Sequence, residues 1–273
     1  MRLTCAQLHV ENGDVAGNVD RAAEAIDTAA AEGADLVVLP ELFNVGYFAF
    51  DSYARRAESL AGETLTELSA RAADHGVALL AGSIVEDLEA TRRETAVETP
   101  AEDGLANTAV LFDAAGERRA VYRKRHLFGY GSAEPDLLTP GDSQGVATLS
   151  LGGEDVTVGM TTCYDVRFPE QFRTLAEAGC DLVCVPSAWP YPRVEHWQLL
   201  PRARAVENQF YVATANGSGA FEESTLLGRS TIYDPEGHAL ASTGDGPALV
   251  SATVDPGRVD SVRESFPAWH DRR

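Results

Sequence analysis

The chain has 273 residues, 44% of them hydrophobic, which is enough to bury a core and disfavours a disordered chain. Its 42 Asp and Glu residues against 22 Lys and Arg residues give a net charge of -20, which disfavours binding to nucleic acid or to anionic membranes. No apolar run approaches the ~20 residues that cross a bilayer, and no signal pattern precedes the first strand, so we expect a cytoplasmic protein.

Strands and helices are predicted to alternate along the chain. Apolar β-type runs occupy residues 3–10, 35–40, 77–86, 156–162 and 181–186, and helical patterns occupy 18–33, 62–76 and 168–179. Helices of this length between strands indicate an α/β fold with covered sheets. Gly33, Gly76 and Gly179 mark helix ends, because glycine takes the left-handed position after a helix without steric cost.

Two of these units resemble copies of one design. EGADLVVLPE at 32–41 and AGCDLVCVPS at 178–187 share a Gly-x-Asp entry, an apolar strand and a closing proline. Such units are common, so one pair favours two related halves without establishing a duplication. The pair locates equivalent strand ends at Pro40 and Pro186, and sites in open α/β sheets form at the carboxyl ends of strands.

The remaining segments are predicted to be one loop and two hairpins. Residues 87–104 lack periodicity and are rich in charge, Thr, Pro and Ala, which predicts an exposed loop. Gly-containing turns between β-type runs predict hairpins at 107–124 and 230–243. No linker divides the chain, so we expect a single domain over 1–273.

The four cysteines have no CxxC spacing, so neither disulfides nor a zinc site is expected in a reducing compartment. Cys5, Cys180 and Cys184 lie in β runs and are interpreted as core residues. Cys163 lies where an apolar strand ends and a helix starts near Phe168, a turn that can expose a thiol and offer backbone N–H groups to an oxyanion. A lone cysteine is usually structural, and this turn is what favours Cys163 as a nucleophile.

Glu41 and Lys124 are selected by position and by composition. Glu41 follows Leu39 and Pro40 at the end of a buried strand, where a catalytic carboxylate and an ordinary loop glutamate are about equally favoured. Lys124 is the single lysine of the chain, and every other basic residue is arginine. One lysine could stand there by chance, but a compact ammonium is what a developing oxyanion requires. Thiol, carboxylate and ammonium together predict an acyl-transfer site that works through a thioester.

The ordered motifs resemble those of the nitrilase superfamily of carbon-nitrogen hydrolases, in its small-amidase branch. The resemblance runs end to end through LTCAQLHV, LPELFNVGY, NTAVLFDAAGE, YRKRHLF, EPDLLTPGD, CYDVRFPE, CDLVCVPSAWP, RARAVENQFYVATANG and GRSTIYDPEG. It implies a four-layer α-β-β-α sandwich that needs neither cofactor nor metal. It also implies a homodimer or higher homo-oligomer, with residues 258–273 able to pack on a partner.

Position by position, the family's Glu–Lys–Cys triad falls on Glu41, Lys124 and Cys163. The resemblance assigns Glu134, which alone would be a loop carboxylate, to positioning the lysine and the substrate. It further implies that the Tyr164 backbone N–H holds the oxyanion together with the lysine. In RAVENQ, Glu207 is interpreted as a supporting structural carboxylate.

The residues after the nucleophile bear on the substrate. CYD and PSAWPYPRVEHW resemble omega-amidases, which hydrolyse the side-chain amide of a 2-oxo acid, whereas nitrilases show Cys-Trp-Glu and carbamoylputrescine amidases show Cys-Trp-Asp. The resemblance therefore implies a small-molecule amide as substrate. A nitrilase, an N-carbamoyl amine amidohydrolase and a catalytically inactive scaffold are the alternatives, and the intact catalytic set speaks against the scaffold.

A substrate that carries a carboxylate needs a cation in the pocket. Arg193 or Arg167 could clamp that carboxylate, although each could instead form an intramolecular ion pair in so acidic a protein. Trp189, Phe128 and Tyr47 could form the pocket wall or be core aromatics.

The acidic, lysine-poor composition predicts a dependence of stability on salt. It is typical of adaptation to a halophilic cytoplasm, because ~1 M salt shortens the Debye length to roughly 3 Å and screens self-repulsion. We expect the melting temperature, followed by circular dichroism, to be higher in molar KCl than in dilute buffer. Equal melting temperatures in the two conditions would contradict a halophilic adaptation.

Overall fold

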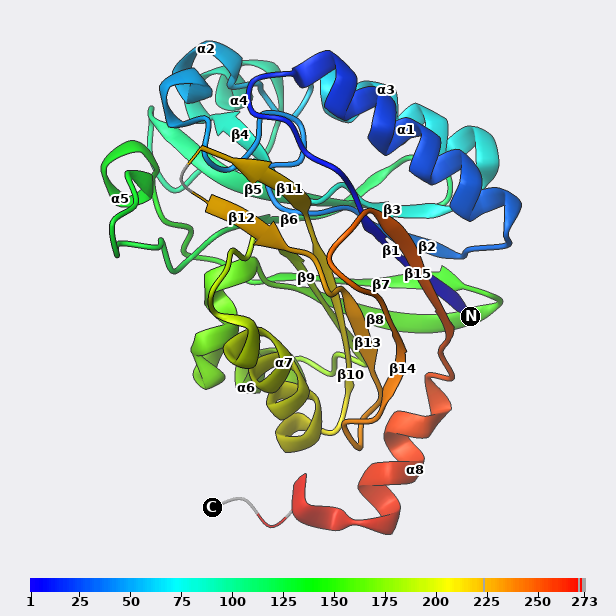
Figure 1. Ribbon diagram of the computed structural model, residues 1–273. Coiled ribbons are helices and arrows are strands. Elements are labelled where there is room, and N and C mark those ends of the chain that lie inside the picture. The colour runs from blue at the N-terminus through cyan, green and yellow to red at the C-terminus, as the bar shows by residue number, and fades with distance from the viewer. Residues whose placement is uncertain (223, 270, 272–273) are drawn as a thin grey trace.

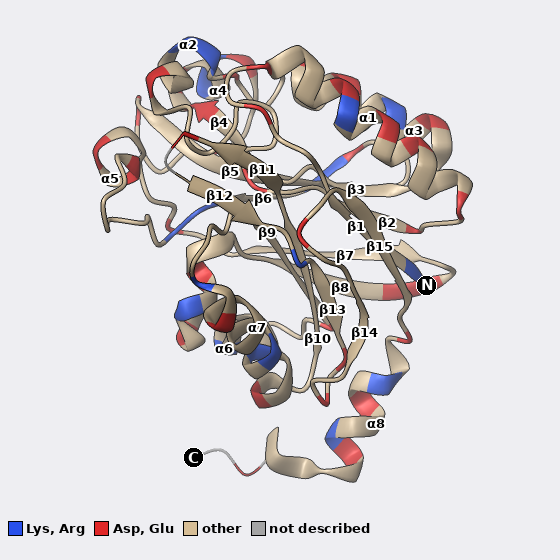
Figure 2. Ribbon diagram, in the orientation of Figure 1, with Lys and Arg blue, Asp and Glu red and all other residues tan. Residues whose placement is uncertain are grey.

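The computed structural model describes residues 1–222, 224–269 and 271. Two mixed β-sheets lie face to face, and helices cover the outer side of each sheet (Figure 1). No helix of the described residues is long and apolar enough to span a membrane. Acidic residues are spread over the outer helices and the connecting loops, with basic residues interspersed among them (Figure 2).

The first sheet is built from the N-terminal half of the chain and the last strand. Its strand order is β15-β1-β2-β3-β5-β4, with β6 paired to β5. Its strands are β1 (Arg2–Gln7), β2 (Leu36–Val38), β3 (Ala78–Leu80), β4 (Ile84–Asp87), β5 (Leu105–Phe112), β6 (Arg118–Arg123) and β15 (Ala248–Thr253). The helices on its outer face are α1 (Val15–Ala31) and α3 (Glu63–His75).

The second sheet is built from the C-terminal half. Its order is β14-β13-β10-β9-β8-β7. Its strands are β7 (Gly145–Leu151), β8 (Glu154–Met160), β9 (Leu182–Ser187), β10 (Tyr211–Asn216), β13 (Thr231–Tyr233) and β14 (Ala239–Ser242), and its helices are α6 (Pro169–Glu177) and α7 (Val194–Asn208). The other elements are η1 (Phe50–Ser52), α2 (Tyr53–Arg56), α4 (Leu88–Glu94), α5 (Glu134–Leu137), η2 (Cys163–Arg167), the β11 (Ser218–Phe221) and β12 (Ser224–Leu227) hairpin, α8 (Gly257–Ser265) and η3 (Pro267–Trp269).

Alternating side chains divide the core into layers. In β2, Leu36 and Val38 pack between the two sheets, whereas Val37 packs against α1 and α3. In β9, Cys184 packs between the sheets and Val185 packs on the side of α6 and α7. Because successive strand residues point to opposite faces, one apolar run serves two layers. The predicted four-layer α-β-β-α sandwich is confirmed.

The two sheets repeat one connectivity. Strands β1, β2 and β3 are parallel neighbours, and so are β8, β9 and β10. An antiparallel strand flanks each trio on both sides, β15 and β5 in one sheet and β7 and β13 in the other. This repetition agrees with the interpretation of two related halves, and it makes the ends of β2 and β9 structurally equivalent.

The local predictions at helix ends and cysteines can be compared directly. Gly33, Gly76 and Gly179 have φ angles of 83°, 68° and 82°, so the predicted left-handed positions are confirmed. Cys5, Cys180 and Cys184 are all buried, as expected of core residues. The prediction that Cys180 lies in a strand is wrong, because it lies in the connection just before β9.

The prediction of an exposed loop over 87–104 is wrong for its first part. Residues Leu88–Glu94 form α4, whose N-terminus is capped by the Asp87 carboxylate. Leu88 and Thr91 are buried on one side of this helix, Asp87 ends β4, and residues 95–104 lie outside helices and strands. A seven-residue helix with one buried aliphatic side chain gives too weak a periodic signal to be recognised in sequence.

Gly82 lies close to the backbone of Pro40, the residue before Glu41. It has a φ of 37°, and a Cβ there would lie 2.0 Å from the Pro40 carbonyl oxygen. We expect Gly82→Ala to lower the free energy of unfolding, measured in urea, by roughly 1–3 kcal/mol. The expected amidase activity should fall as well, because relief of the clash displaces the residue before Glu41.

Gly76→Ala is the matched control for this substitution. Gly76 also has a positive φ, but no atom lies within 4 Å of its added Cβ. We expect it to cost only about 1 kcal/mol and to leave activity unchanged. Equal effects of the two substitutions on activity would contradict the steric role assigned to Gly82.

Candidate active site

The side chains selected from the sequence follow strand ends that meet at one edge of the sandwich. Glu41 comes three residues after β2, Lys124 directly follows β6, and Cys163 begins η2 after β8. The equivalent end of β9 also contributes, because the Glu41 N–H donates to the Ser187 carbonyl at 3.4 Å. Glu134 begins α5, in the loop that follows Lys124.

An ammonium paired with two carboxylates forms the centre of the site. Lys124 Nζ donates to Glu41 Oε1 at 2.8 Å and lies 2.7 and 3.0 Å from the two carboxylate oxygens of Glu134. No more than 1% of any of these three side chains is exposed. The charges are thus paired out of water, where an unpaired charge would be strongly unfavourable.

Uncharged N–H donors make further hydrogen bonds to both carboxylates. Glu41 Oε1 also accepts from Asn107 Nδ2 at 2.8 Å, and Glu41 Oε2 accepts from the Ala188 N–H at 2.9 Å. Glu134 Oε2 accepts from the Phe128 N–H at 2.7 Å. These hydrogen bonds fix the orientation of both carboxylates around the ammonium.

The nucleophile turn is held in an uncommon backbone conformation. Cys163 has a φ of 48°, and Leu42, next to Glu41, has a φ of 44°. Non-glycine residues rarely adopt this left-handed region, and such strain is often found at functional sites. In this conformation the Cys163 thiol lies close enough to the Glu41 carboxylate for the charge of Glu41 to raise the pKa of the thiol.

A buried carboxylate ties the nucleophile turn to the strand that carries the lysine. Asp165 accepts from the Thr162 N–H at 2.9 Å, from the Tyr122 hydroxyl at 2.6 Å, and from the N–H and Nδ1 of His126 at 3.1 and 2.7 Å. Thr162 directly precedes the nucleophile, whereas Tyr122 and His126 lie two residues before and two residues after Lys124. This one side chain therefore sets the distance between the two segments.

Glu207 supports the same turn from α7, as its interpretation as a supporting carboxylate anticipated. Its Oε1 accepts from Arg204 Nη1 at 2.8 Å, and Arg204 Nε donates to the Val166 carbonyl in η2 at 2.9 Å.

Burial sets the protonation states of the central groups. It raises the pKa of the Cys163 thiol well above its usual value, with the charge of Glu41 adding to the effect and that of Lys124 opposing it. Burial also raises the pKa of Glu41, against the opposing charge of Lys124. For Lys124, burial lowers the pKa, but Glu134 and Glu41 raise it, and its pKa ends well above the usual value. The resting site therefore holds a neutral thiol and an ammonium.

A pocket of about 390 Å³ adjoins the thiol and the ammonium. Its lining includes Cys163 and Lys124 together with all the residues that the sequence suggested for the oxyanion or the substrate, namely Tyr47, Phe128, Tyr164, Arg167, Trp189 and Arg193. The aromatic candidates are thus pocket residues as well as packed ones. The Tyr47 hydroxyl, for example, also donates to Glu134 Oε2 at 3.2 Å.

The two pocket arginines contact aromatic rings. The guanidinium carbon of Arg167 lies 4.9 Å from the ring centre of Trp189, and that of Arg193 lies 5.6 Å from the ring centre of Phe128. Within the described residues, neither guanidinium has a carboxylate oxygen within 4.0 Å, so the ion-pair alternative finds no support there.

Sequence reasoning missed three contributors to the site. They are the Asn107 side chain, the Asp165 side chain and the Ala188 backbone N–H. Asn107 and Asp165 lie in the NTAVLFDAAGE and CYDVRFPE runs that carry the family resemblance, so their positions were conspicuous although their roles were not. A backbone donor such as Ala188 leaves no signal in a sequence.

Comparison with known proteins decides the family. Residues 2–264 match the carbon-nitrogen hydrolase family. The chain belongs to this family. A nitrilase-superfamily protein of Saccharomyces cerevisiae, from branch 10, superposes with a TM-score of 0.86 at 30% identity, covering 100% of this chain and 96% of the other.

Two further relatives bear on the chemistry of this carbon-nitrogen hydrolase. A 2-oxoglutaramate amidase of Paenarthrobacter nicotinovorans is 40% identical over 240 residues, which cover 88% of this chain and 79% of the relative. An amidase of Nesterenkonia sp., solved with the acetamide moiety of fluoroacetamide covalently added at its active-site cysteine, has a TM-score of 0.79 at 30% identity, covering 100% and 97%. The expected activity, thiol-dependent hydrolysis of carbon-nitrogen bonds in linear amides, is confirmed.

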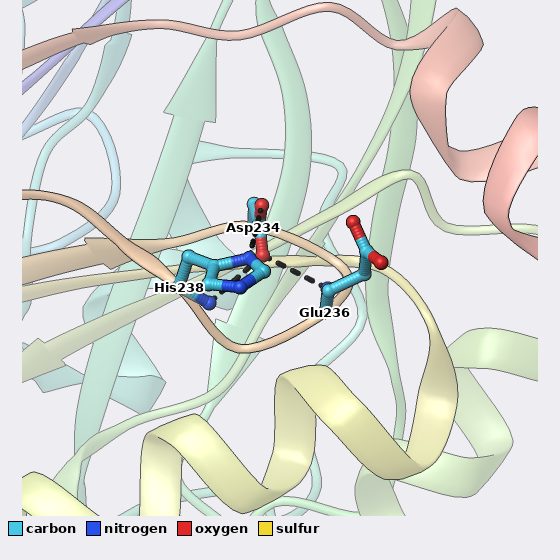
Figure 3. Close-up of side chains that lie close together, drawn as sticks. All are labelled: Asp234, Glu236 and His238. Carbon is cyan, nitrogen blue, oxygen red and sulfur yellow. Dashed lines mark hydrogen bonds and ion pairs between the residues drawn. The ribbon is translucent and has the colours of Figure 1, made fainter.

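Outside the pocket of this hydrolase, one cluster has the composition of a metal site. Asp234, Glu236 and His238, in the turn between β13 and β14, place their ligand atoms within 4.8 Å of one another (Figure 3). Asp234 Oδ1 accepts the backbone N–H of both other residues, and Oδ2 lies 3.1 Å from His238 Nδ1. Arg258 of α8 pairs with both carboxylates. A guanidinium thus already supplies positive charge, and the cluster fastens α8 to the hairpin.

Proposed function

We propose that this hydrolase releases ammonia from the side-chain amide of a 2-oxo acid, such as 2-oxoglutaramate, through a thioester on Cys163. The observation that carries the proposal is the Lys124 ammonium, which is paired with two carboxylates and lines the same pocket as the thiol. The name of the 2-oxoglutaramate amidase relative supports the choice of substrate.

The first step transfers a proton and forms a carbon–sulfur bond. Because the thiol is neutral at rest, its proton passes to Glu41 as sulfur attacks the amide carbonyl carbon. The carbonyl π electrons move to oxygen and create a tetrahedral oxyanion. Glu41 is the acceptor because its carboxylate interacts electrostatically with the thiol.

Lys124 and the Tyr164 N–H stabilise the oxyanion in this mechanism. An ammonium has three N–H donors; one is directed to Glu41 and one is shared between the oxygens of Glu134, which leaves one for the pocket that Lys124 lines. Tyr164 lies in the first turn of η2, where a backbone N–H has no intrahelical acceptor. Glu134 acts as a positioning residue, since it holds Nζ in place.

The second half of the cycle regenerates the thiol. The carbon–nitrogen bond breaks as nitrogen takes the proton from Glu41, and ammonia leaves the thioester behind. Glu41 then removes a proton from water as the water oxygen attacks the thioester carbon. The carbon–sulfur bond breaks, the carboxylic acid is released, and sulfur recovers the proton.

Substitution of the central residues tests these roles. We expect Cys163→Ala, Glu41→Gln and Lys124→Arg each to abolish measurable ammonia release while the circular dichroism spectrum is retained. Arginine should fail because the sealed cluster has no room for its larger fork. Ammonia release retained in Cys163→Ala would refute the assignment of Cys163 as the nucleophile.

Arg167 and Arg193 are proposed to bind the substrate carboxylate. They are cations in a pocket of a chain with a net charge of -20, and each lies over an aromatic ring that would help to hold it in place. This arrangement favours an amide that also carries a carboxylate over a neutral amide or a nitrile.

A substrate panel tests this preference. Ammonia release should be fastest from 2-oxoglutaramate, slower from simple aliphatic amides, and slowest from carbamoyl amines and nitriles. Arg167→Gln and Arg193→Gln should each raise KM for 2-oxoglutaramate by about 10-fold or more while leaving KM for a neutral amide unchanged. Arg71→Gln on α3, which removes an ion pair with Asp27 of α1, is the control. A KM that rises equally for neutral and anionic amides would refute the clamp.

The homodimer and the cytoplasmic location stay predictions. Apolar side chains exposed on α7 and after α8, namely Leu199, Val206 and Phe266, support association with a second copy, which sedimentation velocity can test.

A further inference from the structure

Asn107 contacts all three charged residues of the catalytic centre, the two glutamates through its side chain and Lys124 through the backbone, and the mechanism above gives it no role. Its side chain, on β5, is buried, and its Nδ2 lies 2.8 Å from Glu41 Oε1 and 3.4 Å from Glu134 Oε1. Its backbone carbonyl accepts the Lys124 N–H at 2.9 Å. Asn107 does not line the pocket, so it acts on the reaction through the charged residues and not through the substrate.

The orientation of the Asn107 amide is set by the carboxylates. A flipped amide would point Oδ1 at two carboxylate oxygens, so Nδ2 must be the group that faces them. In this orientation Oδ1 is buried and, among the described residues, has no hydrogen-bond partner. A buried unpaired acceptor lowers stability. Asn107 thus donates to both carboxylates although its own acceptor is left unpaired.

The hydrogen bond from Asn107 affects which oxygen of Glu41 can accept the thiol proton. Glu41 Oε1 already accepts from Lys124 Nζ and Asn107 Nδ2, whereas Oε2 accepts, among the N–H donors of the described residues, only that of Ala188. With two lone pairs per oxygen, Oε1 is saturated and Oε2 has one left for the thiol. We propose that Asn107 is a positioning residue that saturates Glu41 Oε1, so that the thiol proton is received and returned on Glu41 Oε2.

This inference rests on the proposed function, and it completes the proton path. As the Cys163 S–H bond breaks, the O–H bond forms on Oε2, and the sulfur electron pair forms the bond to the substrate carbon. When the carbon–nitrogen bond breaks, the same proton leaves Oε2 for the departing nitrogen. Without Asn107, Oε1 competes for the proton at a position directed at Lys124, away from the thiol.

Asn107→Asp tests the donor with little change of shape. The groups that face position 107 are Glu41, Glu134 and Lys124, with Tyr47 and Cys163 the other titratable groups of the centre. The introduced carboxyl group can still donate one hydrogen bond when it is protonated, whereas its ionised form adds a third carboxylate. We expect kcat of the variant at about pH 8 to be roughly 100-fold lower than that of wild type, with KM changed less than about 3-fold. The ratio of variant kcat to wild-type kcat should rise again as the pH is lowered toward about 5.5.

The matched control is Asn208→Asp in α7. Asn208 is also buried, its Nδ2 donates to the Arg204 carbonyl, and its Oδ1 likewise has no partner among the described residues. A charge placed there should lower the melting temperature without changing the shape of the pH profile. An Asn107→Asp profile parallel to that of wild type would show a merely structural role and overturn the inference.

Two further measurements separate the inference from folding failure and from a wrong substrate. Asn107→Ser, whose hydroxyl can still donate, should retain more activity than Asn107→Ala, and equal rates in the two folded variants would also overturn the inference. Alkylation of Cys163 by iodoacetamide needs no substrate, and its rate in Asn107→Asp should show the same recovery at low pH. Wild type that is alkylated at Cys163 yet releases no ammonia from the panel would refute the proposed function alone.

Discussion

The burial of one ammonium between two carboxylates is the interaction on which the site depends. Removing one partner from such a group typically costs about 3–5 kcal/mol, because the remaining charge is left unpaired in a medium that solvates it poorly. Lys124, Glu41 and Glu134 come from three separate segments, so their pairing requires the surrounding loops to be fixed. The same interaction raises the pKa of Lys124 and keeps it cationic where an oxyanion would form.

The repeated architecture explains how these segments meet. Strands β2 and β9 are equivalent members of two parallel trios, and face-to-face packing brings their carboxyl ends together. The residues after those ends, Glu41 and Ala188, are joined by a hydrogen bond of 2.9 Å. The close approach is tight, as the positive φ of Leu42 and the contact of Gly82 with Pro40 demonstrate. The packing of the two sheets therefore also fixes the geometry of the catalytic residues.

The charge of the pocket is opposite to that of the molecule. An overall charge of -20 repels an anionic substrate at long range, and salt screens this repulsion within roughly 10 Å at 0.1 M. Close to the site, Arg167, Arg193 and Lys124 present cations to the pocket. These cations would attract a carboxylate-bearing amide, the proposed substrate, over short distances, where screening acts least.

The sequence alone determined the alternation of strands and helices, the strand ends beside Glu41 and Cys163, and the composition that singled out Lys124. Each of these is a property of one short segment, since periodicity records how a single strand or helix is buried. The tertiary structure decided what a segment cannot encode. Asn107 and Lys124 reach Glu41 across 66 and 83 residues, and α4 is a helix because its neighbours bury Leu88 and Thr91. Partners at that separation are chosen by packing, so their roles become visible only when the chain is folded.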